Sequence, residues 1–575
     1  MNKNALLILA FSLLLIILPF FWRHPFPYAF ESALHIRTSI GFSQAFADDP
    51  GYPDWFAVPY NGRGTPLFRF LGPFPLFVAM LFQFIGIPGY LAAKLTFLCF
   101  FLLGSLAAYH LTDTECKKFK PAFFLILTNP YIVLFLHFAF QFQNVCAYFL
   151  FPLIILGWQK LANDEKGGWH ILSLTLGIMA CTHLQTTLLT FYASILFGLF
   201  LCVQRQQKRF LPLTLILAAA AFSFFFAAPY ILPAMSTMHE TFFSDAGMRN
   251  LAPGGQTTPF LNNHLVIENS VTIPVYKGFS LIFAYLGISP ASNHDIYLLS
   301  SASRFEHFRP WIMAMCLLVF AIGLFALLKS ENSSYEKTLL VSGLSILLMS
   351  FSLTKPLWDI LPGLHFVQFP WRVVFPASTM ILVGANRYLI NMFEKNTGKA
   401  IIMLILPWLL LITIFTLPGK AWPEKFLDES LQKGSYPPFL PKSIPRDAKL
   451  SELSGQPHRF RVLPHEQVFD AAETGLSWAN YSFENIAETR QLNILTHFDP
   501  YWRAKMLSKG AIDQTDYQEL PIAAHRDGTI QVAIPAGSYS LSLYRLRPNG
   551  RAIGYLLFFL ASGFWVISLR KIRQK

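Results

Sequence analysis

Long apolar runs, repeated along most of the chain, restrict its fold more than any other feature. Roughly twelve segments each contain near 20 mostly apolar residues, enough to cross about 30 Å of bilayer hydrocarbon. They cover approximately residues 5–22, 90–110, 122–139, 144–160, 170–184, 186–204, 210–231, 309–328, 337–353, 373–390, 400–418 and 552–569. Backbone polar groups inside a bilayer must bond within the chain, so these segments predict helices. We therefore expect an α-helical polytopic membrane protein with about 12 transmembrane helices.

The composition agrees with that class. Of the 575 residues, 54% are hydrophobic and 13% are charged, against about 25% charged in ordinary soluble domains. The net charge of +13 would suggest nucleic acid in a soluble protein. Here Lys and Arg fall mostly in short connections between apolar runs, as the positive-inside bias requires. We therefore predict membrane lipids, and no nucleic acid, as partners.

The basic connections also predict the topology, with both chain ends in the cytoplasm. The apolar stretch Phe74–Ile87 would reverse this order if it crossed the membrane, so we expect an interfacial or re-entrant helix there. The outer face then carries long loops at 23–89 and 234–308, a short loop at 354–372, and a soluble segment at 419–551. Residues 1–418 form the membrane core, and residues 552–575 form a final transmembrane helix with a basic cytoplasmic tail.

The soluble segment has the alternation of β-strands. In Thr529–Arg545, apolar residues alternate before and after a turn at Pro535–Gly537, and shorter alternating runs occur at Arg459–Leu463 and Leu492–Thr496. About 130 residues suffice for a small β-sandwich. We expect this domain to be extracytoplasmic, periplasmic or extracellular.

The opening loop contains the first set of candidate site residues. Glu31 and His35 stand four apart and share one face if the segment is helical. A carboxylate beside a histidine can take a proton from an acceptor hydroxyl or orient a metal, and Arg37 can hold an anionic leaving group. Asp54 and Trp55 follow in the same loop as substrate-binding candidates. The alternative is a solvated interfacial helix with a hydrogen-bonded pair.

Histidines at predicted outer helix ends form a second set. His137 stands near Gln141 and Gln143 after one span, and His183 stands between two others. The predicted topology places them on the same side as Glu31, where they can face one cavity. Structural histidines bonded within the fold are the alternative.

A third set lies in the segment His365–Arg372, at the outer entry to a span, and contains Gln368, Trp371 and Arg372. A planar guanidinium matches the oxygens of a lipid phosphate. Arg372 beside Trp371 is equally well explained as an interfacial anchor.

Common nucleotide and hydrolase motifs are absent from the sequence. It has no GxxxxGK[ST], GxGxxG, HExxH or GxSxG pattern in the required context. Its six cysteines lack the spacing of a zinc or redox site. The sequence identifies no cofactor with certainty, and a divalent cation stays possible.

Several short motifs resemble one group of bacterial membrane proteins. They are Glu31-Ser-Ala-Leu-His35, Asn61–Phe68, Asn129-Pro-Tyr131, Thr182-His-Leu184, Gln368-Phe-Pro-Trp-Arg372 and, in the outer domain, Phe498–Ala504 and Ile534–Ser538. Together they resemble the integral membrane proteins labelled 6-pyruvoyl-tetrahydropterin synthase-related, and the wider YfhO-like group. The resemblance implies the architecture of GT-C glycosyltransferases, with a catalytic carboxylate in the first outer loop and sugar donors carried on polyprenyl phosphate.

The resemblance therefore implies a transferase in a bacterial inner (plasma) membrane. It would move a sugar from a polyprenyl-phosphate donor to a cell-envelope glycan, lipid or protein. Glu31, where the family usually has Asp, would be the general base or would orient the acceptor. His35 would support it. Arg372 would hold the donor phosphate, with Arg37 as a second candidate for that role, and Trp55 and Trp371 would either stack on sugars or anchor the chain at the membrane interface.

Two other functions fit the sequence. A non-catalytic transporter or assembly scaffold for polyprenyl-linked glycans would keep Arg372 and the aromatic residues but tolerate loss of Glu31. Gln141 and Gln143 stand where the family often has a charge pair, which favours this alternative. A sensor whose β domain binds envelope material is the third possibility.

Overall fold

The computed structural model describes most of the chain. The described residues are 3–22, 32–48, 50–57, 64–112, 120–136, 142–204, 210–237, 299–329, 333–350, 354–364, 367, 370–416, 459–463, 468–474, 478–508, 517–526, 528–548 and 550–573. Four predicted site residues lie outside these ranges: Glu31, His137, Gln141 and Gln368. The side chain of Trp371 and most of the predicted loop 234–308 also lie outside the described part.

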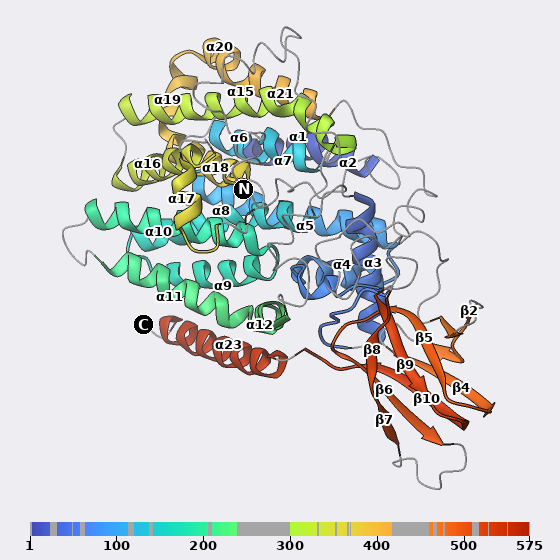
Figure 1. Cartoon of the computed structure of the whole chain (residues 1–575). Coiled ribbons are helices and arrows are strands. Elements are labelled where there is room, and N and C mark those ends of the chain that lie inside the picture. The colour runs from blue at the N-terminus through green and yellow to red at the C-terminus, as the bar shows by residue number, and fades with distance from the viewer. Residues whose placement is uncertain are drawn as a thin grey trace.

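Helices make up the larger part of the fold (Figure 1). In chain order they are α1 (Lys3–Ser12), η1 (Leu13–Ile17), α2 (Leu18–Trp22), α3 (Ser32–Asp48), η2 (Leu67–Arg69), α4 (Phe74–Phe84), α5 (Gly89–Thr112), α6 (Pro121–Leu127), α7 (Pro130–Leu134), α8 (Phe142–Ala162), α9 (Gly168–Ala180), α10 (Leu184–Gln204), α11 (Leu211–Phe226), α12 (Ala228–Thr237), α15 (Leu299–Lys329), α16 (Ser334–Leu348), α17 (Lys355–Ile360), η10 (Pro370–Val373), α18 (Val374–Gly384), α19 (Asn386–Lys395), α20 (Thr397–Ala400), η11 (Ile401–Ile405), α21 (Leu406–Thr416) and α23 (Arg551–Arg573).

Five described helices are long and apolar enough to cross a membrane. They are Lys3–Phe21, α5, α8, α10 and the Arg551–Arg570 part of α23. Helices α11 and α12, bent by 74° at their junction, make a sixth if they count as one span. The chain is thus a membrane protein with a helical core, as expected. Several of the roughly twelve predicted spans are shorter or broken in the structure.

The predicted span 122–139 is broken into α6 and α7. Pro130 lacks a backbone N–H and starts α7, where the Asn129 side chain accepts a hydrogen bond from the Tyr131 N–H at 3.0 Å. Two partners satisfy polar groups at the break. The Trp408 indole donates to the Thr128 carbonyl at 3.0 Å, and the Asn129 amide donates to the Ser378 hydroxyl at 2.8 Å.

The stretch Phe74–Ile87 forms the 11-residue helix α4. At about 1.5 Å per residue it is roughly 16 Å long, which is too short to cross the hydrocarbon. This agrees with our expectation that it does not span. The predicted span 210–231 instead bends between α11 and α12, where Pro229 in the first turn of α12 removes a backbone donor.

The predicted β domain is a sandwich of two antiparallel five-stranded sheets. Its strands are β1 (Phe460–Leu463), β2 (Val468–Phe469), β3 (Glu473–Thr474), β4 (Trp478–Ile486), β5 (Arg490–His497), β6 (Trp502–Ser508), β7 (Gln518–Leu520), β8 (Ile522–Ala524), β9 (Thr529–Ile534) and β10 (Gly537–Arg545). One sheet has the order β2-β1-β5-β9-β8 and the other β3-β4-β10-β6-β7.

The two strands predicted in Thr529–Arg545 are present, but they do not pair as a hairpin. Strand β9 bonds to β5 and β8, whereas β10 bonds to β4 and β6. The turn at Pro535–Gly537 carries the chain between sheets, and Gly537 adopts a φ of 130°, which favours glycine. The alternation of apolar residues correctly predicts which side chains face inward. Because β9 and β10 lie in facing sheets, their inward side chains meet in one core.

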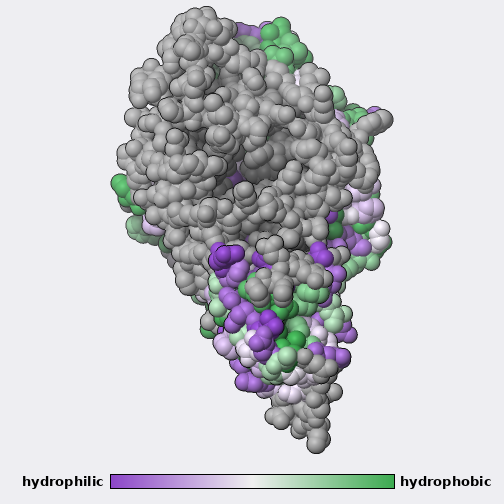
Figure 2. Space-filling model, turned by 45° about the vertical axis from the view of Figure 1, so that its right-hand side comes forward, coloured by the Kyte–Doolittle hydropathy of each residue, from purple (hydrophilic) through white to green (hydrophobic). Residues whose placement is uncertain are grey.

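The opening loop packs between the helices and the β domain. Trp55 and Ala57 belong to the apolar core of the sandwich, although they precede its strands by some 400 residues. The sandwich lies at the end of the helical bundle that carries α3 and α4 (Figure 1). On the face shown in Figure 2, hydrophilic residues dominate its described surface, with smaller hydrophobic patches between them.

The final helix α23 packs along α11 and α12 and leaves much of its apolar surface exposed. Gly554 permits this contact, because a Cβ there would lie 2.7 Å from the Ala228 carbonyl oxygen. Farther along the same helix, a Cβ on Gly563 would meet no atom within 4 Å. Gly554 and Gly563 therefore form a matched pair of positions for testing this contact by substitution.

We expect Gly554→Ala to lower the unfolding temperature of the purified protein, because the methyl group forces α23 away from α12. Gly563→Ala should leave it unchanged or raise it, since alanine favours a helix by up to about 1 kcal/mol. Thermal unfolding in detergent, followed by tryptophan fluorescence, measures both. Equal effects from the two substitutions would contradict the close contact.

Candidate functional site

A buried polar cluster surrounds His183, which lies in the turn before α10. Its Nδ1 accepts a hydrogen bond from the Thr186 backbone N–H at 3.2 Å and lies 2.7 Å from the Thr186 hydroxyl. That hydroxyl also lies 2.8 Å from Asn144 Oδ1 on α8. Since Nδ1 accepts a hydrogen bond, the neutral ring carries its own proton on Nε2, where it can donate to a ligand.

Two groups from other segments act electrostatically on His183. Burial, and then the interactions with Arg372 and His35, lower the pKa of His183 well below the usual range. Arg372 comes from η10 and His35 from α3, so segments far apart in sequence meet here. The ring is thus neutral at pH 7, in surroundings that favour an anion.

Arg372 is 4% exposed, and a hydrogen bond to its backbone carbonyl holds it in place. The Tyr148 hydroxyl on α8 donates to the Arg372 carbonyl at 3.3 Å, and Tyr131 on α7 lies 3.4 Å from the Tyr148 hydroxyl. These contacts fix the start of η10 against the broken helix α6–α7. A buried guanidinium is costly to desolvate, which makes it valuable where an anion must be bound.

Three predicted site residues therefore come together: His35, His183 and Arg372. Their predicted roles stay predictions. His35 is 6% exposed, and its ring lies 6.5 Å from that of Phe142. Next to Phe142, the Gln143 side chain is 3% exposed, and its Nε2 has no hydrogen-bond partner among the described residues. Arg37, on the same helix as His35, is half-buried, and burial lowers its pKa.

Asp54 belongs to a different cluster, a closed ring of two carboxylates and two guanidinium groups. Arg69 lies 3.1 Å from Asp54 and 3.3 Å from Asp499. Arg545 lies 2.5 Å from Asp54 and 3.0 Å from Asp499. All four side chains are at most 7% exposed. The ring joins the opening loop, which supplies Asp54 and Arg69, to the β domain.

Trp55 also faces the β domain. Its ring makes an edge contact with Trp502 at 5.5 Å, and the Arg545 guanidinium lies 4.8 Å from its centroid. A Cβ on Gly64 would lie 2.5 Å from the Trp55 indole nitrogen, and the Gly64 carbonyl is 2.8 Å from His497 Nδ1. The observed contacts of Asp54 and Trp55 are thus with the protein itself, and their predicted substrate contacts stay predictions.

The same loop is fixed to the helices near His183. The Phe74 N–H donates to the Cys181 carbonyl at 2.8 Å, and a Cβ on Gly72 would lie 2.0 Å from the Thr182 carbonyl oxygen. Tyr230 on α12 donates to the Phe70 carbonyl at 2.9 Å. The segment 69–74 therefore connects the charged ring on the β domain to the turn that holds His183.

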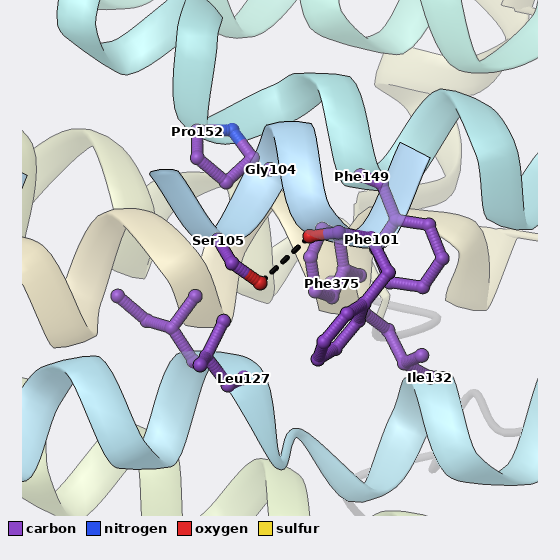
Figure 3. A pocket seen from close by; sticks show the side chains of 9 residues that line it. Phe101, Gly104, Ser105, Leu127, Ile132, Phe149, Pro152 and Phe375 are labelled. Carbon is purple, nitrogen blue, oxygen red and sulfur yellow. Dashed lines mark hydrogen bonds between the residues drawn. The ribbon is translucent and has the colours of Figure 1, made fainter. Parts of the chain in front are cut away.

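The pocket in Figure 3 is separate from the polar cluster around His183. It lies between α5, α6, α7, α8 and α18, and Phe101, Phe149 and Phe375 supply much of its lining. Its one polar group, the Ser105 hydroxyl, donates to the Phe101 carbonyl at 2.7 Å. The apolar lining and small size make it a packing gap between helices.

In the described part of the chain, no three His, Cys, Asp or Glu side chains form a group that could hold a metal ion. Glu31 lies outside that part. A role for a divalent cation therefore stays a proposal, and no step below depends on it.

Sequence reasoning missed several buried polar residues, at these sites and elsewhere in the core. Lys94 lies outside both clusters: it is 1% exposed in α5, and its Nζ donates to the Phe21 carbonyl at 3.3 Å, where a cation suits the end of the first helix. A lysine inside an apolar run was the available signal. Asn144 and Thr186 were similarly visible as polar residues in apolar runs. Arg69 and Arg545 gave no such signal.

Comparisons with known proteins give the following results. No protein-family model matches the chain, and no curated protein matches it. The solved structures similar to it include the oligosaccharyltransferase of Archaeoglobus fulgidus in complex with zinc and sulfate, at 15% identity and a TM-score of 0.41, over 74% of this chain and 54% of that one. This chain thus spans about half the length of that protein.

ArnT from Cupriavidus metallidurans is similar in two states. The apo structure has 13% identity and a TM-score of 0.30, over 67% of this chain and 78% of that one. The structure bound to undecaprenyl phosphate has 11% identity and a TM-score of 0.26, over 68% of this chain and 79% of that one. At these values the similarities carry no functional argument, and the resemblance to YfhO-like proteins stays an expectation.

We expect Asp54→Asn to destabilise the protein by about 3–5 kcal/mol, because it leaves two buried guanidinium groups with one carboxylate. Glu165→Gln is the matched control. Glu165 lies 2.6 Å from Lys160, with side chains 46% and 31% exposed respectively, and ion pairs in contact with solvent contribute at most about 1 kcal/mol. Chemical unfolding in detergent measures the two losses, and equal losses would contradict a structural role for the ring.

Acid should weaken the same ring. Burial alone would raise the pKa of Asp54, but Arg545 and then Arg69 outweigh it and lower the pKa from 3.8 to about 2. A lowered folded-state pKa stabilises the fold above the unfolded-state pKa, and this contribution is lost as pH falls through the folded value. The contribution amounts to about 2–3 kcal/mol, at about 1.4 kcal/mol per pKa unit.

The stability difference between wild type and Asp54→Asn should therefore be constant above about pH 4 and narrow toward about pH 2. Unfolding measured over this range tests the expectation. A difference that does not change with pH would mean that the Asp54 carboxylate is not the group that titrates.

Proposed function

We propose that this protein is a membrane glycosyltransferase of the GT-C type, which transfers a sugar from a polyprenyl-phosphate donor to a cell-envelope glycan, lipid or protein. One observation carries the proposal: Arg372 and His35, from distant parts of the chain, converge on the half-buried His183 and act on it electrostatically. A lipid phosphate is an anion that can reach such a site directly from the bilayer.

The cluster offers the donors that a departing phosphate requires. Arg372 supplies a permanent charge with paired N–H groups, and neutral His183 supplies Nε2–H. Low local dielectric strengthens both interactions, and the effect is largest where negative charge develops in the transition state. The rigid support of Arg372 by Tyr148 limits the reorganisation that binding would need.

The proposed reaction assigns the general base to Glu31, four residues before His35. The Glu31 carboxylate takes the proton of an acceptor hydroxyl, whose oxygen attacks the anomeric carbon of the donor sugar. The bond from that carbon to the phosphate oxygen breaks with its electron pair on the phosphate. Polyprenyl phosphate is the leaving group, and the Arg372 guanidinium binds its negative charge. Arg37, on the same helix as His35, is the second candidate for this role.

The test compares wild type with Glu31→Gln and with Arg372→Ala, each in lipid nanodiscs. Mass spectrometry of the lipid measures how much undecaprenyl-phosphate sugar each protein consumes. Glu31→Gln should lower turnover about 100- to 10,000-fold without loss of donor binding, as expected for removal of a general base. Arg372→Ala should weaken binding of undecaprenyl phosphate at least about tenfold.

Arg387→Ala is the control for loss of an arginine. Arg387 lies on α19 with a side chain 54% exposed, 3.7 Å from Glu336, and its loss should change neither quantity. Binding without turnover, weakened by Arg372→Ala and unchanged by Glu31→Gln, would instead indicate the non-catalytic transporter or scaffold. Absence of binding would overturn both functions.

A further inference from the structure

The sheet β3-β4-β10-β6-β7 has an outer face unlike its buried one. On β10, Tyr539, Leu541 and Leu543 are at most 2% exposed and face the sandwich core. Strand alternation therefore places Ser540, Ser542 and Tyr544 on the opposite face. The same alternation places Trp478 and Asn480 of β4, and Arg503 and Lys505 of β6, on that outer face.

Aromatic rings form a row across this outer face. The strand register pairs Tyr544 with Trp478 on one side and with Arg503 on the other. Lys505 Nζ lies 5.4 Å from the Tyr544 ring and 5.1 Å from the ring of Tyr517, just before β7. Trp478 and Tyr517 are 37% and 51% exposed. The row crosses three strand spacings, about 14 Å in all.

Polar side chains beside the row are held in fixed positions. Asn480 donates to Glu473 at 3.1 Å and accepts from the Ser542 hydroxyl at 2.8 Å. The Tyr544 hydroxyl donates to Glu519 at 3.5 Å. Groups that are already oriented lose less conformational entropy when a ligand binds.

We propose that this outer face binds a neutral glycan chain. Exposed rings stack on the C–H faces of pyranose sugars, while the neighbouring amide, carboxylate and hydroxyl groups bond to sugar hydroxyls. The cations Arg503 and Lys505 are balanced by Glu473 and Glu519, so the face does not select a polyanion such as nucleic acid. The row crosses the interior strands β4, β10 and β6, whose backbones are already paired, so it offers no edge to an added peptide strand.

This site does not depend on the proposed function. It lies on the β domain, apart from the His183 cluster, and binding there requires no polyprenyl phosphate and no turnover. A transferase, a scaffold and a sensor would each retain it. Glycan binding and sugar transfer can thus fail separately.

The experiment titrates the full-length protein in nanodiscs with cellohexaose and with chitohexaose, two neutral chains of flat pyranose units, by isothermal calorimetry. At least one should bind with a Kd below about 1 mM. Trp478→Ala and Tyr544→Ala should each weaken it at least about tenfold, which corresponds to about 1.4 kcal/mol of binding free energy. Trp478→Phe keeps a ring and should retain most of the affinity.

Phe469→Ala is the matched control. Phe469 is 39% exposed, close to the value for Trp478, but it lies on β2 in the other sheet. Its loss should leave glycan binding unchanged. Failure of both probes to bind, or equal affinities for wild type and Trp478→Ala, would overturn the proposal. An equal loss in Phe469→Ala and Trp478→Ala would also overturn it, since it would show a general effect on the fold.

Discussion

The buried ring of Asp54, Arg69, Asp499 and Arg545 connects the parts of this protein. Desolvating four charged groups is expensive, and only close, mutual pairing offsets that cost. The ring forms only when the opening loop and the β domain are both in place, since each supplies one acid and one base. It therefore favours one docked arrangement over others, with Trp55 and Trp502 packed beside it.

The position of the polar cluster follows from this docking. Arg69 lies at the start of the segment 69–74, whose far end bonds to the turn before His183. Movement of the β domain would therefore pull on the loop that lies against the cluster. The β domain thus holds the loop in place together with the loop's own apolar contacts to the helices, such as those of Tyr52 with Tyr230 and of Phe74 with Phe100.

Broken helices give the cluster its place within the apolar core. Tyr131 follows the break at Asn129-Pro130, and Arg372 lies in η10, just before α18. Non-helical backbone inside a membrane protein requires partners for its polar groups, and Trp408 and Ser378 supply them here. The motif Asn129-Pro-Tyr131 thus lies where the predicted span 122–139 is broken, and Arg372, the last residue of Gln368-Phe-Pro-Trp-Arg372, lies just before the start of α18.

The sequence by itself determined the membrane class, the position of most helices and the alternation of the β-strands, because apolar periodicity is a local property. It also singled out His35, His183 and Arg372, since polar residues near apolar runs are few. Only the tertiary structure decided that these three meet, that Asp54 pairs with Arg545, and that β9 and β10 belong to different sheets. Those contacts join residues up to about 490 positions apart, and local pattern carries no information on which distant charges will share one buried site.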